Sequence, residues 1–277
     1  MATLWLVNGR TTGVDPSDRG LAYGDGLFET MAAADGQIRR IELHLDRLTG
    51  GCAQLGIPAP DLDQIRQEIA AHCPARGRAV VKLIVTRGPG ARGYAPPPHP
   101  EPTRILGISA WPDYPAGNYS RGIAIHTLRT RLGENPRLAG LKHLSRLEQV
   151  LARMELQSVD AQEGLMLDTG GRVVSGVSSN VFAVRGASLL TPALTRCGVK
   201  GVMRRAVLEA ASDVGLEPEE RDLEPAELAA ANEIFVTNAL FEIWPVARLD
   251  DRPITPGAKT RALMARLGIV ECVSDSG

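Results

Sequence analysis

The sequence predicts an α+β protein of two lobes, and three observations favour this fold class. The order of expected strands and helices lacks the regular alternation of a parallel βαβ sheet, so mostly antiparallel sheets suit it better. The pair Asp35-Gly36 between two apolar segments indicates a β-hairpin, because both residues tolerate positive φ. The segment from Pro112 to Gly117 is rich in Pro, Gly and Asn, as a linker would be. We therefore expect a smaller N-terminal α/β lobe over residues 1–114, a linker over 115–122, and a larger C-terminal lobe of strands and helices over 123–277.

The N-terminal lobe is expected to hold strands and two helices. Leu45, Leu48, Cys52 and Leu55 recur at helical spacing, and a second helix follows Pro60-Asp61. The Pro- and Gly-rich stretch 87–102 cannot form regular structure, since proline has no N–H to donate. The strands predicted for this lobe are 3–7, 27–33, 37–41, 79–86 and 104–110.

The C-terminal lobe is expected to start with a strand over 123–128 and an amphipathic helix over 143–157. A run of short strands follows over 164–191, with turns at Gly170-Gly171 and Arg185-Gly186. The remaining elements predicted are a helix over 203–214, a strand over 233–237 and a helix over 256–267.

Composition narrows the class of function. A chain of 277 residues with 44% hydrophobic content can bury a substantial core. The net charge of −1 is evenly spread, which argues against nucleic acid and membrane surfaces and favours a small-molecule substrate. No segment resembles a signal peptide or a transmembrane helix, so we expect a cytoplasmic protein. The four cysteines lack metal-ligand or disulfide spacing, so we expect no metal site and assign them to core packing: Cys52, Cys73, Cys197 and Cys272.

Lys142 stands in the run 131–150, between an irregular Gly/Pro stretch and the helix predicted to follow it. Burial and neighbouring cations can leave a lysine with a free amine that forms a Schiff base with pyridoxal phosphate, although most lysines are solvated surface charges. Together with segments 17–30 and 44–48, this run resembles the 4-amino-4-deoxychorismate lyases of the aminotransferase class IV group. The resemblance covers essentially the whole chain. It implies a fold-type IV pyridoxal-phosphate enzyme with Lys142 as the catalytic, cofactor-binding residue.

A phosphate group needs backbone N–H groups at a helix start and a cation beside them. The segment 198–204 enters a predicted helix through two glycines, which fits such a site but is common in ordinary turns. The resemblance places the amides of Val202 and Met203 on the cofactor phosphate and assigns the phosphate charge to Arg47. It also places Asn238 near the phosphate.

The loop Arg87 to Tyr94 holds two arginines, whose planar forks suit carboxylates. The related D-amino-acid transaminases use the second arginine and a histidine of the matching loop to bind the substrate carboxylate. Here these positions are Arg92 and Tyr94, and Phe28 is assigned to the substrate as well. A solvated loop is the alternative for Arg92, and more strongly for Arg87.

Ser175 departs from the family pattern. The resemblance implies that Ser175, Ser179 and Asn180 contact the cofactor, but relatives commonly carry glutamate where this chain has Ser175. A carboxylate stabilises a protonated pyridine nitrogen, whereas a hydroxyl favours the neutral ring, which is a weaker electron sink. Transamination needs a deep sink and elimination does not, so Ser175 favours a lyase, although the same change could signal lost activity.

The resemblance implies a homodimer that converts 4-amino-4-deoxychorismate to 4-aminobenzoate and pyruvate in folate biosynthesis. Two alternatives stay open. One is a transaminase of D- or branched-chain amino acids, and the other is a non-catalytic protein that binds pyridoxal phosphate.

Overall fold

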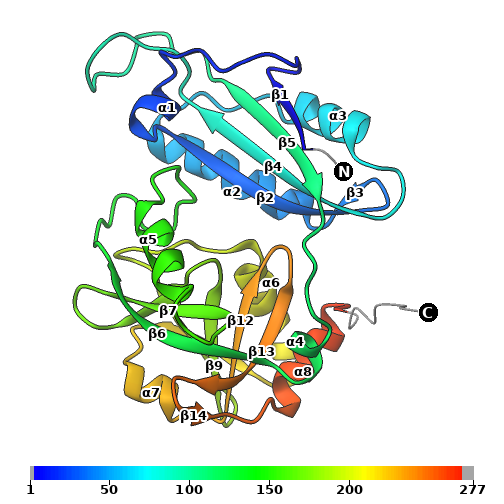
Figure 1. Cartoon of the computed structure of the whole chain (residues 1–277), viewed down its shortest axis with the longest axis vertical. Coiled ribbons are helices and arrows are strands. Elements are labelled where there is room, and N and C mark those ends of the chain that lie inside the picture. The colour runs from blue at the N-terminus through cyan, green and yellow to red at the C-terminus, as the bar shows by residue number, and fades with distance from the viewer. Residues whose placement is uncertain (1–2, 270–277) are drawn as a thin grey trace. The chain divides into compact units, whose positions relative to one another are not determined.

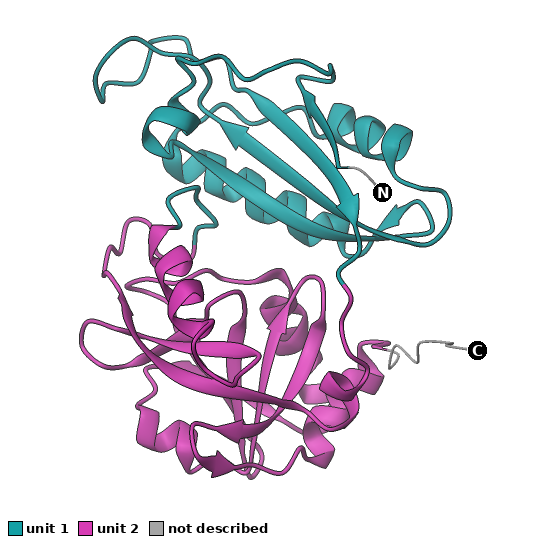
Figure 2. Cartoon of the chain, in the orientation of Figure 1, with its two compact units in different colours: residues 1–112, 141–146 teal, residues 113–140, 147–277 magenta. Residues whose placement is uncertain are grey.

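The computed structural model describes residues 3–269, which form two compact units (Figures 1 and 2). Unit 1 contains the chain up to Pro112 together with Leu141–Arg146, and unit 2 contains Asp113–Gly140 and the chain from Leu147 onward. The segment 115–122, expected as a linker, lies inside unit 2 and includes the short helix α4 (Gly117–Ser120).

Unit 1 is a five-stranded antiparallel sheet with helices packed on it (Figure 1). The strand order is β1-β5-β4-β2-β3, and helix α2 packs against β2 through Leu45, Leu48 and Cys52, which are buried. The elements are β1 (Leu4–Val7), α1 (Arg19–Tyr23), β2 (Gly26–Ala34), β3 (Gln37–Ile38), α2 (Ile41–Leu55), α3 (Leu62–His72), β4 (Arg78–Thr86) and β5 (Arg104–Ala110).

The hairpin predicted at Asp35-Gly36 is confirmed. Both residues have positive φ, 49° and 79°, and they join β2 to β3 with Ala34 opposite Gln37. Asp61 caps α3 by accepting a hydrogen bond from the amide of Gln64. The sequence did not reveal α1, whose amino end is capped by Asp18.

Unit 2 is built on a nine-stranded sheet in which antiparallel pairs predominate. Strand β6 pairs in parallel with β7 and β13, and β10 pairs in parallel with β11. The elements after α4 are β6 (Ile123–Leu132), α5 (Leu147–Leu156), β7 (Glu163–Asp168), β8 (Val173–Gly176), β9 (Asn180–Arg185), β10 (Ser188–Pro192), α6 (Val202–Ala210), the 3-10 turn η1 (Ser212–Val214), β11 (Glu217–Arg221), α7 (Pro225–Ala229), β12 (Glu233–Asn238), β13 (Glu242–Leu249), β14 (Arg252–Pro253) and α8 (Ala258–Arg266).

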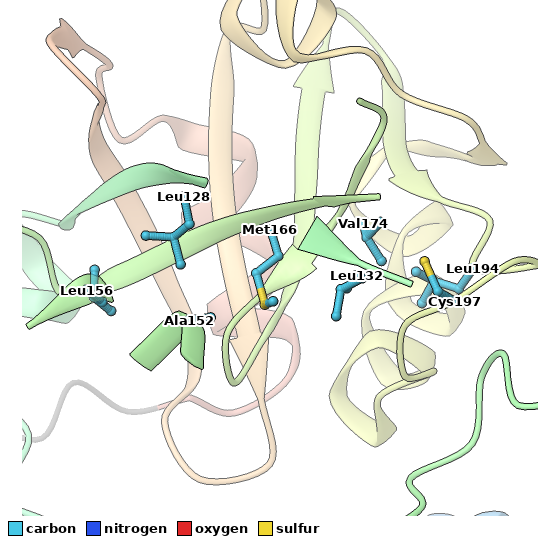
Figure 3. Packing of buried hydrophobic residues seen from close by; sticks show 8 residues of the cluster. All are labelled: Leu128, Leu132, Ala152, Leu156, Met166, Val174, Leu194 and Cys197. Carbon is cyan, nitrogen blue, oxygen red and sulfur yellow. The ribbon is translucent and has the colours of Figure 1, made fainter. Parts of the chain in front are cut away.

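Helix α5 covers part of this sheet through an apolar cluster. Ala152 and Leu156 pack with Leu128, Met166 and their neighbours, as Figure 3 shows. Cys197 belongs to the same cluster, and Cys52 is buried in unit 1. Cys52, Cys73 and Cys197 are free thiols, and Cys272 lies outside the described residues. Helices able to cross a membrane are not found between residues 3 and 269.

The helix predicted over 143–157 is wrong at its start, because α5 begins only at Leu147. The preceding residues are extended and pair with β2: the amide of Leu144 donates to Gly26 O, and His143 bridges Leu27. The backbone of β2 is therefore hydrogen-bonded here by a segment that is not one of the five strands of the sheet. Lys142 consequently lies in an extended segment of unit 1.

Candidate active site

Lys142 is fixed at the edge of β2 in unit 1. The amide of Phe28 donates to the backbone oxygen of Lys142 over 3.0 Å. The amine of Lys142 lies 4.2 Å from the centre of the Phe28 ring, in the geometry of a cation–π contact. The position of the Lys142 amine is thus set by a backbone hydrogen bond and an aromatic ring from the same residue.

The surroundings of Lys142 weaken its ammonium form. Burial lowers the pKa of Lys142 most, although the residue is not fully shielded from solvent. The positive charge of Arg47 lowers this pKa further. Glu29 opposes the shift, whereas Arg146 and Lys82 reinforce it, and the resulting pKa of Lys142 is about 7. A large share of the amine is therefore free near neutral pH, as a carbonyl-trapping lysine requires.

Arg47 belongs to a buried ionic network centred on Glu29. Strand alternation turns Glu29 to the face of β2 opposite Phe28, towards α2. Its carboxylate accepts a hydrogen bond from Arg47 Nε at 2.8 Å and a second from Nη2 of the same arginine. His44 Nδ1 lies 2.6 Å from Oε2 of the carboxylate, the oxygen that also accepts from Nη2 of Arg47.

The network keeps Glu29 ionised. Burial alone would raise the pKa of Glu29, but Arg47 and His44 hold it below its usual range. Burial lowers the pKa of His44, so a neutral imidazole donating through Nδ1 is the form that fits. Glu29 therefore fixes the direction of Arg47, a role that the sequence motifs around both residues did not reveal.

Lys82 on β4 is a second amine beside Phe28. It lies 5.3 Å from the centre of the ring, and its charge contributes to the low pKa of Lys142. The predicted substrate residue Phe28 thus contacts both lysines of this part of unit 1.

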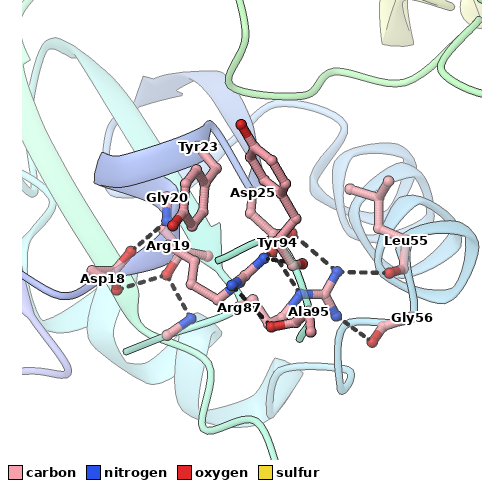
Figure 4. Close-up of polar contacts among 12 residues, drawn as sticks. Asp18, Arg19, Gly20, Tyr23, Asp25, Leu55, Gly56, Arg87, Tyr94 and Ala95 are labelled. Carbon is pink, nitrogen blue, oxygen red and sulfur yellow. Dashed lines mark hydrogen bonds and ion pairs between the residues drawn. The ribbon is translucent and has the colours of Figure 1, made fainter. Parts of the chain in front are cut away.

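The two arginines of the loop predicted to bind a carboxylate differ in their contacts. Arg87 donates from Nε and Nη2 to Asp25, and from Nη1 and Nη2 to the backbone oxygens of Gly56 and Leu55, as Figure 4 shows. Its guanidinium is therefore committed to the fold. Arg92 is exposed, without a hydrogen bond or ion pair from its side chain within residues 3–269, and Tyr94 is 86% exposed.

In unit 2, Asn180 organises the turn that leads into α6. Its side-chain amide donates to Val199 O at 2.8 Å, and its oxygen accepts from the amide of Gly201 at 3.0 Å. A Cβ at Gly201 would stand 2.1 Å from that oxygen, so glycine is needed for this close approach. The structure thus gives Asn180 a structural contact, which the prediction of a cofactor-binding role did not include.

Helix α6 begins at Val202, one residue before the predicted start, and ends at Ala210 rather than at residue 214, because the 3-10 turn η1 follows it. The amides of a first helical turn have no partner within the helix, and the N-cap residue Gly201 offers no side-chain hydrogen bond. This helix end is therefore suited to an anion.

Glu163 is a buried carboxylate that the sequence analysis missed. It accepts hydrogen bonds from the amides of Gly164 and Val177 and from the hydroxyls of Ser178 and Ser179, at 2.9 to 3.0 Å. Its place at the first position of the fully buried strand β7 was the available signal, because an unpaired carboxylate is rarely buried.

The other predicted residues of unit 2 also have internal partners. The Ser175 hydroxyl donates to Gly176 O at 2.8 Å. Asn238 accepts from the amides of Leu240 and Phe241 and donates to Ser178 O at 3.3 Å. Asn238 and Glu163 thus hold the same Ser178 turn from two sides.

Comparison with known proteins gives a consistent result. The sequence profile of the amino-transferase class IV family matches residues 26–249. Aminodeoxychorismate lyase of Vibrio harveyi is 32% identical over 271 residues, covering 95% of this chain and 99% of that protein. A putative branched-chain-amino-acid aminotransferase of Methanocaldococcus jannaschii is 31% identical and covers 90% of this chain and 87% of its own. The crystal structure of 4-amino-4-deoxychorismate lyase from Pseudomonas aeruginosa is 51% identical, with a TM-score of 0.91 over 95% of this chain and 98% of that chain.

Proposed function

The chain belongs to the amino-transferase class IV family, and we propose on that basis that it is a lyase dependent on pyridoxal 5'-phosphate. Its reaction converts 4-amino-4-deoxychorismate to 4-aminobenzoate and pyruvate. The similarity to aminodeoxychorismate lyases over nearly the full chain supports this reaction. The fold is that of the same α+β enzymes.

The observation that carries the proposal is the amine of Lys142, held on the Phe28 ring with a pKa of about 7. Such an amine can bind an aldehyde covalently near neutral pH. Pyridoxal phosphate, when bound, supplies that aldehyde and a ring that withdraws electrons from the amine-bearing carbon of the substrate.

Lys142 is also suited to move the protons of the reaction. Its free amine removes the proton from the amine-bearing ring carbon, and its ammonium returns a proton to the methylene carbon of the departing enolpyruvyl group. The bond that breaks joins the ring to the enolpyruvyl oxygen, which becomes the ketone oxygen of pyruvate. The ring left behind is aromatic. A pKa of about 7 suits both transfers, because neither form of the amine is strongly disfavoured.

The residues of each unit fit the cofactor that the family uses. In unit 1, Arg47 is directed by Glu29 and supplies a fixed cation for the phosphate. In unit 2, the uncapped amino end of α6 offers the amides of Val202 and Met203 to the same class of anion.

The remaining cofactor residues are assigned by their place in unit 2. Ser175, Ser179, Asn180 and Asn238 belong to the strands β8, β9 and β12 and the turn between β8 and β9. Ser179 and Asn180 act mainly by shaping backbone, since Glu163 and Gly201 are their partners. A homodimer working in folate biosynthesis completes the proposal and rests on the family resemblance.

Substrate contacts are assigned to unit 1. Phe28 presents an aromatic surface beside Lys142, and Arg92 and Tyr94 are exposed on their loop. The substrate carries two carboxylates, and arginine binds a carboxylate through two parallel hydrogen bonds. The unpaired guanidinium of Arg92 is therefore the better candidate than Arg87.

Transamination is the second candidate, because the matched relatives include an aminotransferase. Ser175 opposes it, since a hydroxyl cannot stabilise a protonated pyridine nitrogen as a carboxylate does. The two activities differ in their products, which makes them separable by assay.

Borohydride reduction of the protein with its cofactor, followed by peptide mass spectrometry, tests the assignment of Lys142. The cofactor should be found on the peptide containing Lys142, and Lys142→Ala should abolish both labelling and turnover. Attachment at Lys82, Lys200 or Lys259 would show that the lysine is wrongly assigned. The matched control is Lys259→Ala, because the Lys259 amine donates to backbone oxygens of Val214 and Gly215.

A further inference from the structure

The loop that carries Arg92 and Tyr94, residues 87–95, contains no strand or helix of its own. Gly88 and Gly93 have φ values of +88° and +102°, which are conformations that favour glycine. A loop of this kind keeps a binding residue in place only if other groups fix its backbone. In unit 1 those groups come from helix α1.

Arg19 binds the loop through its side chain. Its Nη1 donates to Gly93 O at 3.0 Å and to Ala95 O at 3.2 Å, and its Nη2 donates to Tyr94 O at 2.8 Å. The guanidinium is buried, with 4% of the residue exposed, and its Nε donates to Asp25 at 2.8 Å (Figure 4). Arg19 thus holds three successive carbonyl groups at the far end of the loop.

The backbone of Arg19 holds the near end. Its amide donates to Gly88 O at 3.0 Å, and the amide of Gly90 donates to Ser17 O at 3.1 Å. Gly90 also lies against the stem of Arg19, since a Cβ there would stand 2.9 Å from Arg19 Cδ. Both ends of the loop are therefore tied to one residue.

Tyr23, one helical turn after Arg19, adds a second contact. Its hydroxyl accepts a hydrogen bond from the amide of Gly93 at 3.2 Å, and its ring lies 5.4 Å from the ring of Tyr94. The guanidinium of Arg19 lies over the ring of Tyr23, 4.9 Å from its centre. The backbone of Gly93 is thus held at its oxygen by Arg19 and at its amide by Tyr23.

We propose that Arg19 and Tyr23 are positioning residues for substrate specificity, which hold the loop 87–95 so that Arg92 and Tyr94 meet the substrate carboxylate in a fixed geometry. The inference rests on the proposed function. Arg19 is itself a poor candidate for binding substrate, because it is buried and four of its five N–H groups already serve Asp25 and the three loop carbonyls. Its contribution is preorganisation, since a mobile loop would lose conformational entropy on binding.

Arg87 provides a matched control. Arg19 and Arg87 both donate to Asp25, but the remaining donors of Arg87 go to Leu55 and Gly56 at the end of α2. Lysine keeps the positive charge and loses the planar fork that reaches several acceptors. Arg19→Lys should therefore release the loop, whereas Arg87→Lys should loosen only the contact with α2.

The test compares both variants with the wild-type holoenzyme in two assays. One assay measures kcat and KM for 4-amino-4-deoxychorismate, and the other measures cleavage after Arg92 by a low concentration of trypsin. Arg19→Lys should raise KM about tenfold with kcat within about twofold, which matches the loss of a charged hydrogen bond. It should also speed cleavage after Arg92, whereas Arg87→Lys should leave KM and cleavage near wild type and lower only Tm.

Tyr23→Phe provides a milder variant, which removes one hydroxyl and keeps the ring, so it tests the proposal even where Arg19→Lys folds poorly. It should raise KM and the cleavage rate in the same direction by a smaller factor. Unchanged KM and cleavage in Arg19→Lys, or equal increases of KM in Arg19→Lys and Arg87→Lys, would overturn the proposal. A wild type inactive on aminodeoxychorismate would refute the proposed function. Because trypsin cleavage requires no substrate, faster cleavage in Arg19→Lys would still show that Arg19 holds the loop.

Discussion

Removing the charge of Arg47 should raise the pKa of Lys142, whereas removing the charge of Glu29 should lower it. The two residues form one ion pair, yet their charges act on Lys142 with opposite sign: Arg47 disfavours the ammonium, and Glu29 favours it. Arg47→Gln and Glu29→Gln are therefore a matched pair of variants. Both variants break the same ion pair, but they should shift the pKa of Lys142 in opposite directions.

The size of the effect in the wild type follows from the pKa of about 7. About half of the Lys142 amine is neutral at pH 7, compared with about one in three thousand for a lysine at the ordinary value of 10.5. Below its pKa, each unit of change alters the neutral fraction about tenfold. Reactivity of Lys142 should consequently rise through neutral pH and level off above it.

Brief acylation of the protein purified free of cofactor measures this directly. Labelling of the Lys142 peptide is quantified by mass spectrometry between about pH 5 and 10, with free N-acetyl-lysine as the reference amine, whose pKa is about 10. The midpoint for Lys142 should lie near 7, move up in Arg47→Gln and move down in Glu29→Gln. A wild-type midpoint near that of the reference, or the same direction of shift in both variants, would refute the electrostatic account of Lys142.

Three further outcomes are expected. Arg92→Ala should raise KM about ten- to a hundredfold with little change in cofactor affinity, and Arg47→Ala should do the reverse, because a charged hydrogen bond is worth about 1.5–3 kcal/mol; separate titrations of cofactor and substrate check the division, and equal losses of cofactor affinity would count against it. Ser175→Glu should raise the ratio of amine exchange with D-alanine to lyase turnover, because a carboxylate stabilises pyridinium; an unchanged ratio at full cofactor occupancy would remove the reason for linking Ser175 to elimination. Glu163→Gln should lower the free energy of unfolding by about 2–4 kcal/mol in urea titration, since the Ser178 turn loses its charged acceptor; a loss below about 0.5 kcal/mol would mean that solvent replaces it.

Local patterns predicted most of the fold because local chemistry determines it. Asp35-Gly36 specifies a two-residue turn, and the spacing of Leu45, Leu48 and Cys52 specifies one buried face of α2. The extended segment 143–146 could not be predicted, because its pairing with β2 depends on residues more than a hundred positions away. Strand β13 was missed as well, since its residues are buried and show no alternation.

In the predicted site, too, local motifs suggested residues, whereas their contacts depend on residues far away in the sequence. Lys142 was predicted through its motif, but its position beside Phe28 comes from a long-range backbone hydrogen bond. The sequence favours Arg92 over Arg87 for the carboxylate and leaves Arg87 as solvated loop charge, and only the contacts with Asp25 and the end of α2 reveal that Arg87 is structural. Glu163 is hidden for the same reason, because its partners lie in a turn that follows later in the chain.

Product analysis with 4-amino-4-deoxychorismate as the only substrate tests the central claim most directly. The purified holoenzyme should release 4-aminobenzoate and pyruvate in equal amounts without any added keto acid, and Lys142→Ala should release neither. Each product is quantified separately, 4-aminobenzoate by chromatography and pyruvate by a coupled dehydrogenase. Turnover that requires a keto acid, or amine transfer without pyruvate release, would contradict the assignment of this chain as a lyase.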